Sequence, residues 1–153
     1  DRAYLERVPP PSETLQLLDF KVNGHNVTYD GERAVAFRVN GEGVLVAFAG
    51  NACSAVTVDG KTTDFASQTL PEICWAPVAD ERRVPGGAVL QILAAGSGEV
   101  RVPCPEVAGS VRLFAEGPTK GSRGNEVPCR VEHGLLEFTL APEISGRWLY
   151  VVP

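Results

Sequence analysis

The stretch from Ala34 to Lys61 reads AVAFRV, NGEG, VLVAFAG, NACS, AVTV, DGK, and it decides the fold class. It contains three apolar runs of strand length, and each run ends in residues that favour tight turns. Strands show a period of two residues, and Gly, Asn and Asp adopt the positive φ values that hairpin turns need. Similar patterns continue almost to Pro153, and none of them predicts a helix. The sequence therefore predicts an all-β protein.

The spacing of the strands favours a β-sandwich. About ten or more short strands joined by turn signals are typical of that architecture, so we expect a two-sheet antiparallel sandwich, either a jelly roll or an Ig-like fold. The Ig-like alternative is less favoured because Trp75 directly follows Cys74, whereas the Ig tryptophan lies well apart from both sheet-bridging cysteines. Residues 1–11, with three consecutive prolines at Pro9–Pro11, are predicted as a lead-in or linker, and residues 12–153 as one sandwich domain.

Two hairpins predict the core. One folds about Gly41 and Glu42, and the other about His133 and Gly134. The expected inner pairs are Val39–Val44, Phe37–Val46 and Val35–Phe48 in the first hairpin, and Val131–Leu136, Cys129–Phe138 and Val127–Leu140 in the second. On the outer face of the second hairpin, Arg130 is expected opposite Glu137. The side chains predicted to point inward are Val35, Phe37, Val46, Phe48, Val131, Leu136, Phe138 and Leu140.

The composition argues against several classes of partner. The net charge is −5, and the 14 basic residues are scattered, so neither nucleic acid nor a membrane surface is expected as a partner. No apolar stretch approaches the roughly 20 residues of a membrane span. The cysteines form no C-x-x-C motif, and with only His25 and His133 beside them no metal site is expected. No glycine-rich phosphate loop is present, and no cofactor is expected.

The four cysteines, Cys53, Cys74, Cys104 and Cys129, leave two possibilities open. They are either free buried thiols that act as small hydrophobic side chains, or they form at least one disulfide in an exported protein. If disulfides form, we expect Cys53–Cys74 and Cys104–Cys129. Each would close a loop of about 20 to 25 residues, which is worth roughly 3 kcal/mol in the chain-entropy model.

A ligand site is predicted around Phe114. This ring alternates with Arg112 and Glu116, so it is expected on the polar face of its strand, next to the loop Gly117–Asn125. An exposed aromatic ring stacks on the apolar face of a sugar, and neighbouring polar groups bind its hydroxyls. The predicted ligand-binding residues are Arg112, Phe114, Lys120, Arg123, Asn125 and, by residue type, Trp75, although the neighbours Ile73 and Pro77 favour core packing for Trp75. The alternative is a loop whose aromatic ring is covered by a neighbouring domain.

Catalysis is not favoured, although it stays open. A glycosidase requires two carboxylates about 5 to 9.5 Å apart across a sugar. The acidic residues on predicted strands are few, and Glu137 among them is better explained as the partner of Arg130. His25, His133 and Ser97 lie in turn sequences, which favour a structural role. A small sandwich lyase or hydrolase remains an alternative.

Three segments resemble the β-sandwich accessory modules of bacterial carbohydrate-active enzymes. They are the Pro9–Pro11 run, the turn VTVDGK at Val56–Lys61 and the apolar closing strand RWLYVV at Arg147–Val152. The resemblance implies an exported, non-catalytic module, secreted or on the cell surface, that binds a polysaccharide or other glycan or braces a neighbouring domain. It carries over no site residues. A purely structural or adhesive β-module that contacts protein is the main alternative.

Overall fold

The protein is built from antiparallel strands, as the sequence predicts. The computed structural model describes residues 5–7, 20–22, 24–30, 35–104 and 110–153. Within these ranges the only helical element is one 3-10 turn, η1 (Glu81–Arg83), which Asp80 caps by accepting a hydrogen bond from the backbone N–H of Arg82. The strands form three sheets that pack on one another, so the all-β sandwich class is confirmed.

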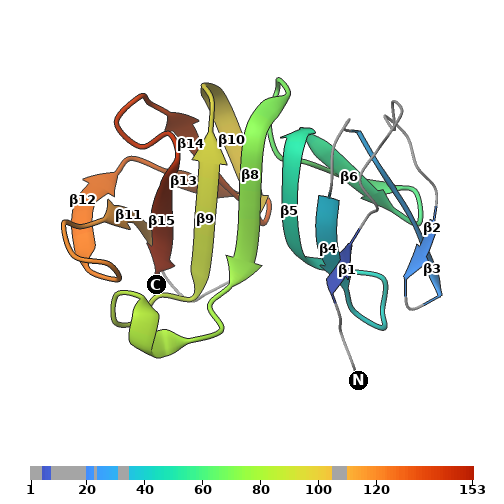
Figure 1. Cartoon of the computed structure of the whole chain (residues 1–153), viewed down its shortest axis with the longest axis horizontal. Helices are drawn as coiled ribbons and strands as arrows, with labels where there is room; N and C mark the ends of the chain where they lie inside the picture. Colours follow the sequence, from blue (N-terminus) through green and yellow to red (C-terminus); the bar gives the residue numbers. More distant parts are fainter. Residues whose placement is uncertain (1–4, 8–19, 23, 31–34, 105–109) are drawn as a thin grey trace.

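One long sheet forms a complete layer of the molecule (Figure 1). It has eight strands, and every neighbouring pair in it is antiparallel. In spatial order they are β1 (Leu5–Arg7), β4 (Val35–Val39), β5 (Leu45–Cys53), β8 (Leu70–Pro77), β9 (Leu90–Ala95), β15 (Arg147–Val152), β11 (Arg112–Glu116) and β12 (Arg123–Val127). Strand β1 lies within the predicted lead-in, and its pairing with β4 makes residues 5–7 part of the sheet.

Two smaller sheets pack against the long one. The four-stranded sheet contains, in order, β2 (Phe20–Val22), β3 (His25–Tyr29), β6 (Ala55–Val58) and β7 (Lys61–Asp64). The three-stranded sheet contains β10 (Gly98–Pro103), β14 (Leu135–Leu140) and β13 (Arg130–Glu132). The two sheets meet where Ala66 bridges to Val100 and the N–H of Arg101 donates to the carbonyl of Phe65 at 2.7 Å. They therefore form a nearly continuous second layer.

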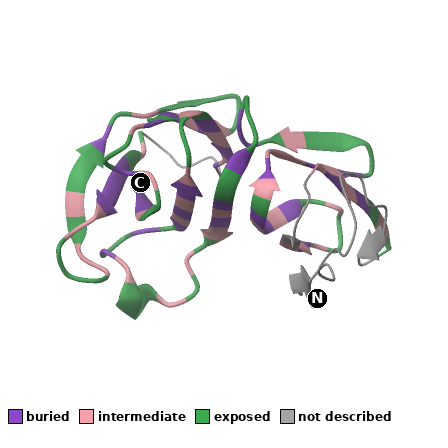
Figure 2. Cartoon of the chain, turned by 45° about the horizontal axis from the view of Figure 1, so that its top comes forward, coloured by how far each residue is buried: buried purple, intermediate pink, exposed green. Residues whose placement is uncertain are grey.

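A single hydrophobic core lies between the layers. Buried and less buried residues alternate along β9, as the period of two requires, whereas β11 and β15 each contain three consecutive buried residues (Figure 2). Phe65 is completely buried at the junction of the two smaller sheets, and its ring stacks on Phe48 at 5.0 Å between centroids. Trp75 approaches the same ring at 6.1 Å, and its indole N–H donates to the carbonyl of Pro103 at 3.1 Å. These contacts hold the two halves of the chain together.

The first hairpin has a different register from the predicted one. Phe37 pairs with Phe48 instead of Val46, because the connection is wider than a two-residue turn. The side chain of Asn40 accepts hydrogen bonds from the N–H groups of Glu42 and Val44. A β-bulge beside this turn shifts the register between Arg38 and Val39. The shift of two residues keeps both phenylalanines on the core face. It leaves Val44 50% exposed and Val46 only half-buried, so the prediction for Val46 is wrong.

The second hairpin is confirmed in part. Arg130 pairs with Glu137 and forms an ion pair at 2.8 Å, as predicted, and Val131 lies opposite Leu136. Val131 is nevertheless 46% exposed, because β13 is an edge strand with β14 as its only strand partner among the described residues. Val127 pairs with Leu113 of the long sheet rather than with Leu140, because the chain crosses between the layers after β12. Of the other residues predicted to point inward, Phe37, Phe48, Leu136, Phe138 and Leu140 are buried, and the side chain of Val35 lies outside the described part.

Candidate functional site

Phe114 lies on the predicted face of its strand but is not exposed. Its neighbours Leu113 and Ala115 belong to the core, so the ring points to the opposite face of the long sheet. The guanidinium of Arg123 lies 4.3 Å from the ring centroid, and that of Arg112 lies at 5.0 Å. These two cations leave Phe114 only 5% exposed. The prediction of an exposed ring is therefore wrong, because two of its predicted polar partners cover it.

The cluster around Phe114 satisfies its own polar groups. Arg112 donates two hydrogen bonds to the carboxylate of Glu126, at 2.8 and 3.2 Å, and Glu126 stands opposite Phe114 in the register. The bond from Arg112 holds the pKa of Glu126 below its usual range, and the same bond raises the pKa of Arg112. The structure thus brings together Arg112, Phe114 and Arg123, but as a closed packing cluster with no free aromatic face.

Trp75 has no surface role in this structure. Its side chain is 4% exposed inside the core, where Ile73 and Phe65 accompany it. A ring at that depth presents no face to a ligand. The core packing that its sequence neighbours favoured is therefore the observed arrangement.

The loop after β11 is shorter than the sequence suggests. Arg123 and Asn125 belong to strand β12, and only residues 117–122 form the connection, with Lys120 exposed at its tip. The loop is held by the carboxylate of Glu116, which accepts the N–H of Gly121 at 3.1 Å. Gly121 has φ of 77°, and a Cβ there would lie 2.6 Å from the carbonyl oxygen of Arg83. Glycine is therefore required where this loop packs against the segment that follows η1.

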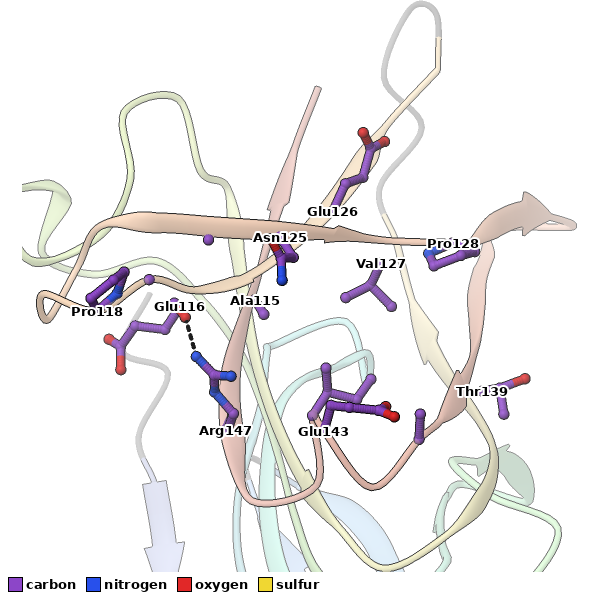
Figure 3. A pocket seen from close by; sticks show the side chains of 14 residues that line it. Ala115, Glu116, Pro118, Asn125, Glu126, Val127, Pro128, Thr139, Glu143 and Arg147 are labelled. Atoms are coloured by element: carbon purple, nitrogen blue, oxygen red, sulfur yellow. Dashed lines mark hydrogen bonds between the residues drawn. The ribbon is translucent and has the colours of Figure 1, made fainter.

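A pocket of about 690 Å³ opens beside β12, on the core side of this loop (Figure 3). We call it the β12 pocket. It is lined by Ala115, Glu116, Gly117, Pro118, Gly124, Asn125, Glu126, Val127, Pro128, Thr139, Ala141, Glu143, Ile144 and Arg147. Its floor is apolar, because the core residues Ala115, Val127 and Ile144 reach it from three different elements. Such a volume and such a lining are typical of small-molecule sites.

The polar groups of the pocket have different partners. Glu126 points away from the pocket toward Arg112, and the carboxylate of Glu116 is turned away to accept the Tyr150 hydroxyl at 3.0 Å (Figure 3). Burial, together with this bond to Glu116, raises the pKa of Tyr150 to about 12. Arg147 donates through Nη2 to the backbone carbonyl of Glu116 at 2.6 Å, which fixes its guanidinium at the pocket wall.

Two polar side chains of the lining remain available. Asn125 and Glu143 are exposed, and neither makes a side-chain hydrogen bond or ion pair with another described residue. With the remaining donors of Arg147 they form a polar rim around an apolar floor. The arrangement can hold a polar ligand by hydrogen bonds while apolar carbon atoms pack below.

Three carboxylates line the pocket. Those of Glu116 and Glu126 are engaged by Tyr150 and Arg112, and that of Glu143 makes no hydrogen bond or ion pair with another described residue. Among the residues that the structure describes, no three His, Cys, Asp or Glu side chains gather in a way that could hold a metal ion. The described part also has no helix long and apolar enough to cross a membrane.

Sequence reasoning found Asn125 but missed Glu143, Ile144 and Arg147. Glu143 and Ile144 come from the connection between β14 and β15, where the N–H groups of Ile144 and Ser145 both donate to the carbonyl of Ala141, and Arg147 is the first residue of β15. This tight turn directs Ile144 into the core, where it is 8% exposed. The available signal was a single apolar residue inside a turn sequence, Pro-Glu-Ile-Ser-Gly at 142–146.

The cysteines are free thiols, and the pairing Cys53–Cys74 is wrong. Both residues lie in the β5–β8 pair, but Cys53 stands opposite Leu70 and Cys74 opposite Ala49. That offset of four residues separates them by about 13 Å along the strands, beyond the 7 Å limit for a disulfide. Burial raises the pKa of Cys53 to about 12, and the carboxylate of Asp30 adds to this effect.

The second predicted pairing, Cys104–Cys129, is not formed either. Cys104 follows β10 and Cys129 precedes β13, so β14 lies between their strands. Burial is the main cause that raises the pKa of both thiols, and the Cys129 thiol adds to the shift of Cys104.

Comparisons with protein-family models, with curated proteins and with solved structures found no match to this chain. The functional argument therefore rests on the residues of the chain itself.

Proposed function

We propose that this protein is a non-catalytic module that binds a glycan in the β12 pocket, as part of an exported carbohydrate-active or cell-surface protein. The observation that carries the proposal is the β12 pocket, in which an apolar floor is combined with a rim of available polar side chains. The proposal keeps the predicted ligand class and moves the site. Arg112, Phe114 and Arg123 become the packed outer side of β12, and Asn125 remains in the site.

The chemistry of the rim suits a neutral sugar. The amide of Asn125, the carboxylate of Glu143 and the guanidinium of Arg147 are planar groups that can each bind neighbouring hydroxyls. The single available carboxylate and the single guanidinium balance in charge, which favours a neutral ligand. The side chains of Val127 and Ile144 and the two prolines of the lining offer apolar surface to the C–H face of the ring.

The state of the three lining carboxylates supports binding without turnover. Glu116 and Glu126 are engaged by Tyr150 and Arg112, which leaves Glu143 as the carboxylate available to a ligand. An accessory role beside a neighbouring domain agrees with such a pocket.

The test is a glycan array with the purified chain, followed by calorimetric titration of each glycan that binds. We expect Glu143→Gln and Asn125→Ala to weaken binding about tenfold or more, since each removes hydrogen bonds to the ligand. Glu42→Gln is the matched control, because Glu42 is exposed on the distant β4–β5 connection. Equal affinity of Glu143→Gln and Glu42→Gln would contradict the proposed site.

A second candidate is contact with a protein. Strand β12 is the last strand of the long sheet, so its outer edge has no strand partner within the described residues. Free edges can accept a strand from another chain. An array with no bound glycan, together with a β12 variant that abolishes capture of a parent-protein domain, would favour this candidate. Release of sugar from any polysaccharide by the isolated chain would instead favour the enzyme alternative.

A further inference from the structure

A second hollow adjoins the β12 pocket. It has a volume of about 500 Å³ and lies on the outer face of the three-stranded sheet, where Glu99, Arg101, Arg130 and Glu137 line it. Pro128 and Thr139 line both this hollow and the β12 pocket. We call it the β14 hollow. The two cavities therefore share one wall, at the point where the chain crosses from one layer to the other.

Most charges of the β14 hollow are already paired. Arg130 contacts Glu137 at 2.8 Å, and the Thr139 hydroxyl donates to the carboxylate of Glu99 at 2.6 Å. Arg101 is different. It stands opposite Glu137 in the register, yet its Nε is buried and has no hydrogen-bond partner among the described residues. A buried guanidinium N–H without an acceptor is costly, so a small shift of the side chain that brings Nε to a hydroxyl oxygen of a ligand in the hollow would be favourable.

We infer that the β12 pocket and the β14 hollow form one groove that holds a neutral oligosaccharide across the shared wall of Pro128 and Thr139. This inference rests on the proposed function and specifies its ligand. Together the two cavities exceed the roughly 300–1,000 Å³ of a single small-molecule site. The β12 pocket holds one sugar over its apolar floor, and the polar β14 hollow holds a following unit beside Arg101.

Pro128 argues for a sugar chain over an extended peptide in this groove. A peptide that adds to a sheet edge needs a continuous ladder of backbone N–H and C=O groups. Pro128 has no N–H, and it stands at the shared wall, so a ladder that begins along β12 is interrupted there. A glycan binds through separate hydroxyl contacts and does not depend on that ladder.

The experiment measures affinity against chain length. Oligosaccharides of one to six units from cellulose, xylan, mannan and β-1,3-glucan are titrated into the whole chain by calorimetry. We expect about tenfold tighter binding once the chain is long enough to reach Arg101, because new hydrogen bonds form only then. Arg101→Gln should abolish this gain and leave the affinity of the shortest bound sugar unchanged, while Glu143→Gln should weaken sugars of every length.

Arg101→Lys and Arg82→Gln complete the set. The first keeps the positive charge and the stem of Arg101 but lacks Nε, so it should lose the length-dependent gain without loss of fold. The second alters an exposed arginine in η1 and should bind like the original chain. A bound monosaccharide with no gain on lengthening would overturn the groove and leave the proposed function standing. Failure of every sugar to bind would overturn both, and binding only of an extended peptide would replace them with the protein candidate.

Discussion

The turns that join β2 to β3, β4 to β5 and β6 to β7 contain polar side chains much like those of the β12 pocket, but they satisfy these side chains internally. His25 contacts the carboxylate of Asp59 through Nδ1 at 2.5 Å and the carbonyl of Gly41 through Nε2 at 3.0 Å. The other oxygen of Asp59 accepts the N–H of Asn26 at 2.9 Å. Three turns are thereby fastened together. In the β12 pocket, by contrast, the side chains of Asn125 and Glu143 are exposed and make no hydrogen bond or ion pair with another residue of the described ranges.

A second set of polar contacts stabilises the half of the molecule that contains these turns. The carboxylate of Asp30 accepts the N–H groups of Ser54 and Ala55 at 3.0 and 2.6 Å, and also the hydroxyl of Ser54. Burial pushes the pKa of Asp30 upward, but the bonds from Ser54, Ala55 and Cys53 outweigh this effect and hold it below its ordinary value. The two regions therefore use similar polar side chains differently. Those of the turns form hydrogen bonds that stabilise the fold, whereas Asn125 and Glu143 of the pocket are available to a ligand.

The largest expected effect tests whether the two regions belong to one folding unit. Phe65 joins them through its ring contacts and through its backbone bonds to Ser54 and Arg101. Phe65→Ala should lower the free energy of unfolding by about 3–5 kcal/mol, because the fully buried ring leaves a cavity. Urea unfolding followed by tryptophan fluorescence measures this value. A loss below about 1 kcal/mol would contradict the central position of Phe65.

Asp30→Ala should cause the next largest loss in the free energy of unfolding. It leaves buried donors of Ser54 and Ala55 without an acceptor, which costs about 1–3 kcal/mol. Because the pKa of Asp30 is lowered on folding, its contribution is present above the unfolded-state pKa and is lost as the pH falls through the folded-state pKa. Unfolding in urea at pH 7 and pH 3 should therefore separate the original chain from the variant more at pH 7. An equal difference at both values would refute the role of its charge.

The His25–Asp59 contact should give a smaller, pH-dependent effect. Both ring nitrogens face oxygen acceptors, so the two contacts together need the protonated imidazole. The carbonyl of Gly41, followed by Asp59, raises the pKa of His25 above 6.5. Its contribution to stability is thus complete below the unfolded-state pKa and is lost as the pH rises through the folded-state pKa.

His25→Gln should remove that pH dependence of the thermal midpoint, and His133→Gln should retain it, because His133 lies in the separate β13–β14 turn. The resonances of the two histidines in an NMR titration provide a direct readout. A midpoint that changes with pH equally in both variants would show that the fastening of the three turns is unrelated to His25.

Glu126→Gln should have the smallest effect on stability. The Arg112–Glu126 pair is exposed, and such pairs contribute little because water screens them. The thermal midpoint should stay within about one degree of the original, while Phe114 remains covered by Arg123. Near-ultraviolet circular dichroism would report movement of the ring, and a large spectral change would show that the ion pair holds the cluster in place.

Local patterns predicted much of the fold, and interactions between distant residues account for most errors. The alternation at residues 35–58 and 130–140 identified the strands and the core faces of Phe37, Phe48, Leu136 and Phe138, because a period of two is a local property, but it misplaced Val46. The bulge in β4–β5 depends on how Asn40 folds its turn, and the exposure of Val131 depends on the position of β13 at the edge of its sheet. Pairing the residues of a single hairpin can predict neither the bulge nor the exposure of an edge strand.

The candidate site was less predictable for the same reason. Alternation gave the face of Phe114 but not its burial, which depends on Arg123 from the next strand. The pocket is assembled from β11, β12, the end of β14, the turn that follows it and the start of β15, segments that meet only in the folded chain. Of the residues predicted to bind a ligand, only Asn125 lines the pocket. The prediction located the segment after Phe114, and Asn125 lies on the part of that segment that forms β12.

The free cysteines give the molecule a set of internal reporters. Cys53 contacts Asp30 at the end of β5, Cys104 follows β10, Cys129 lines the β14 hollow, and burial raises the pKa of all three thiols. An alkylating reagent attacks the thiolate, so labelling is slow until a local opening admits water and reagent. The order in which the cysteines are modified, measured by mass spectrometry, therefore shows which end of the sandwich opens locally first. Added glycan that occupies the groove should slow the labelling of Cys129 and leave Cys53 unaffected.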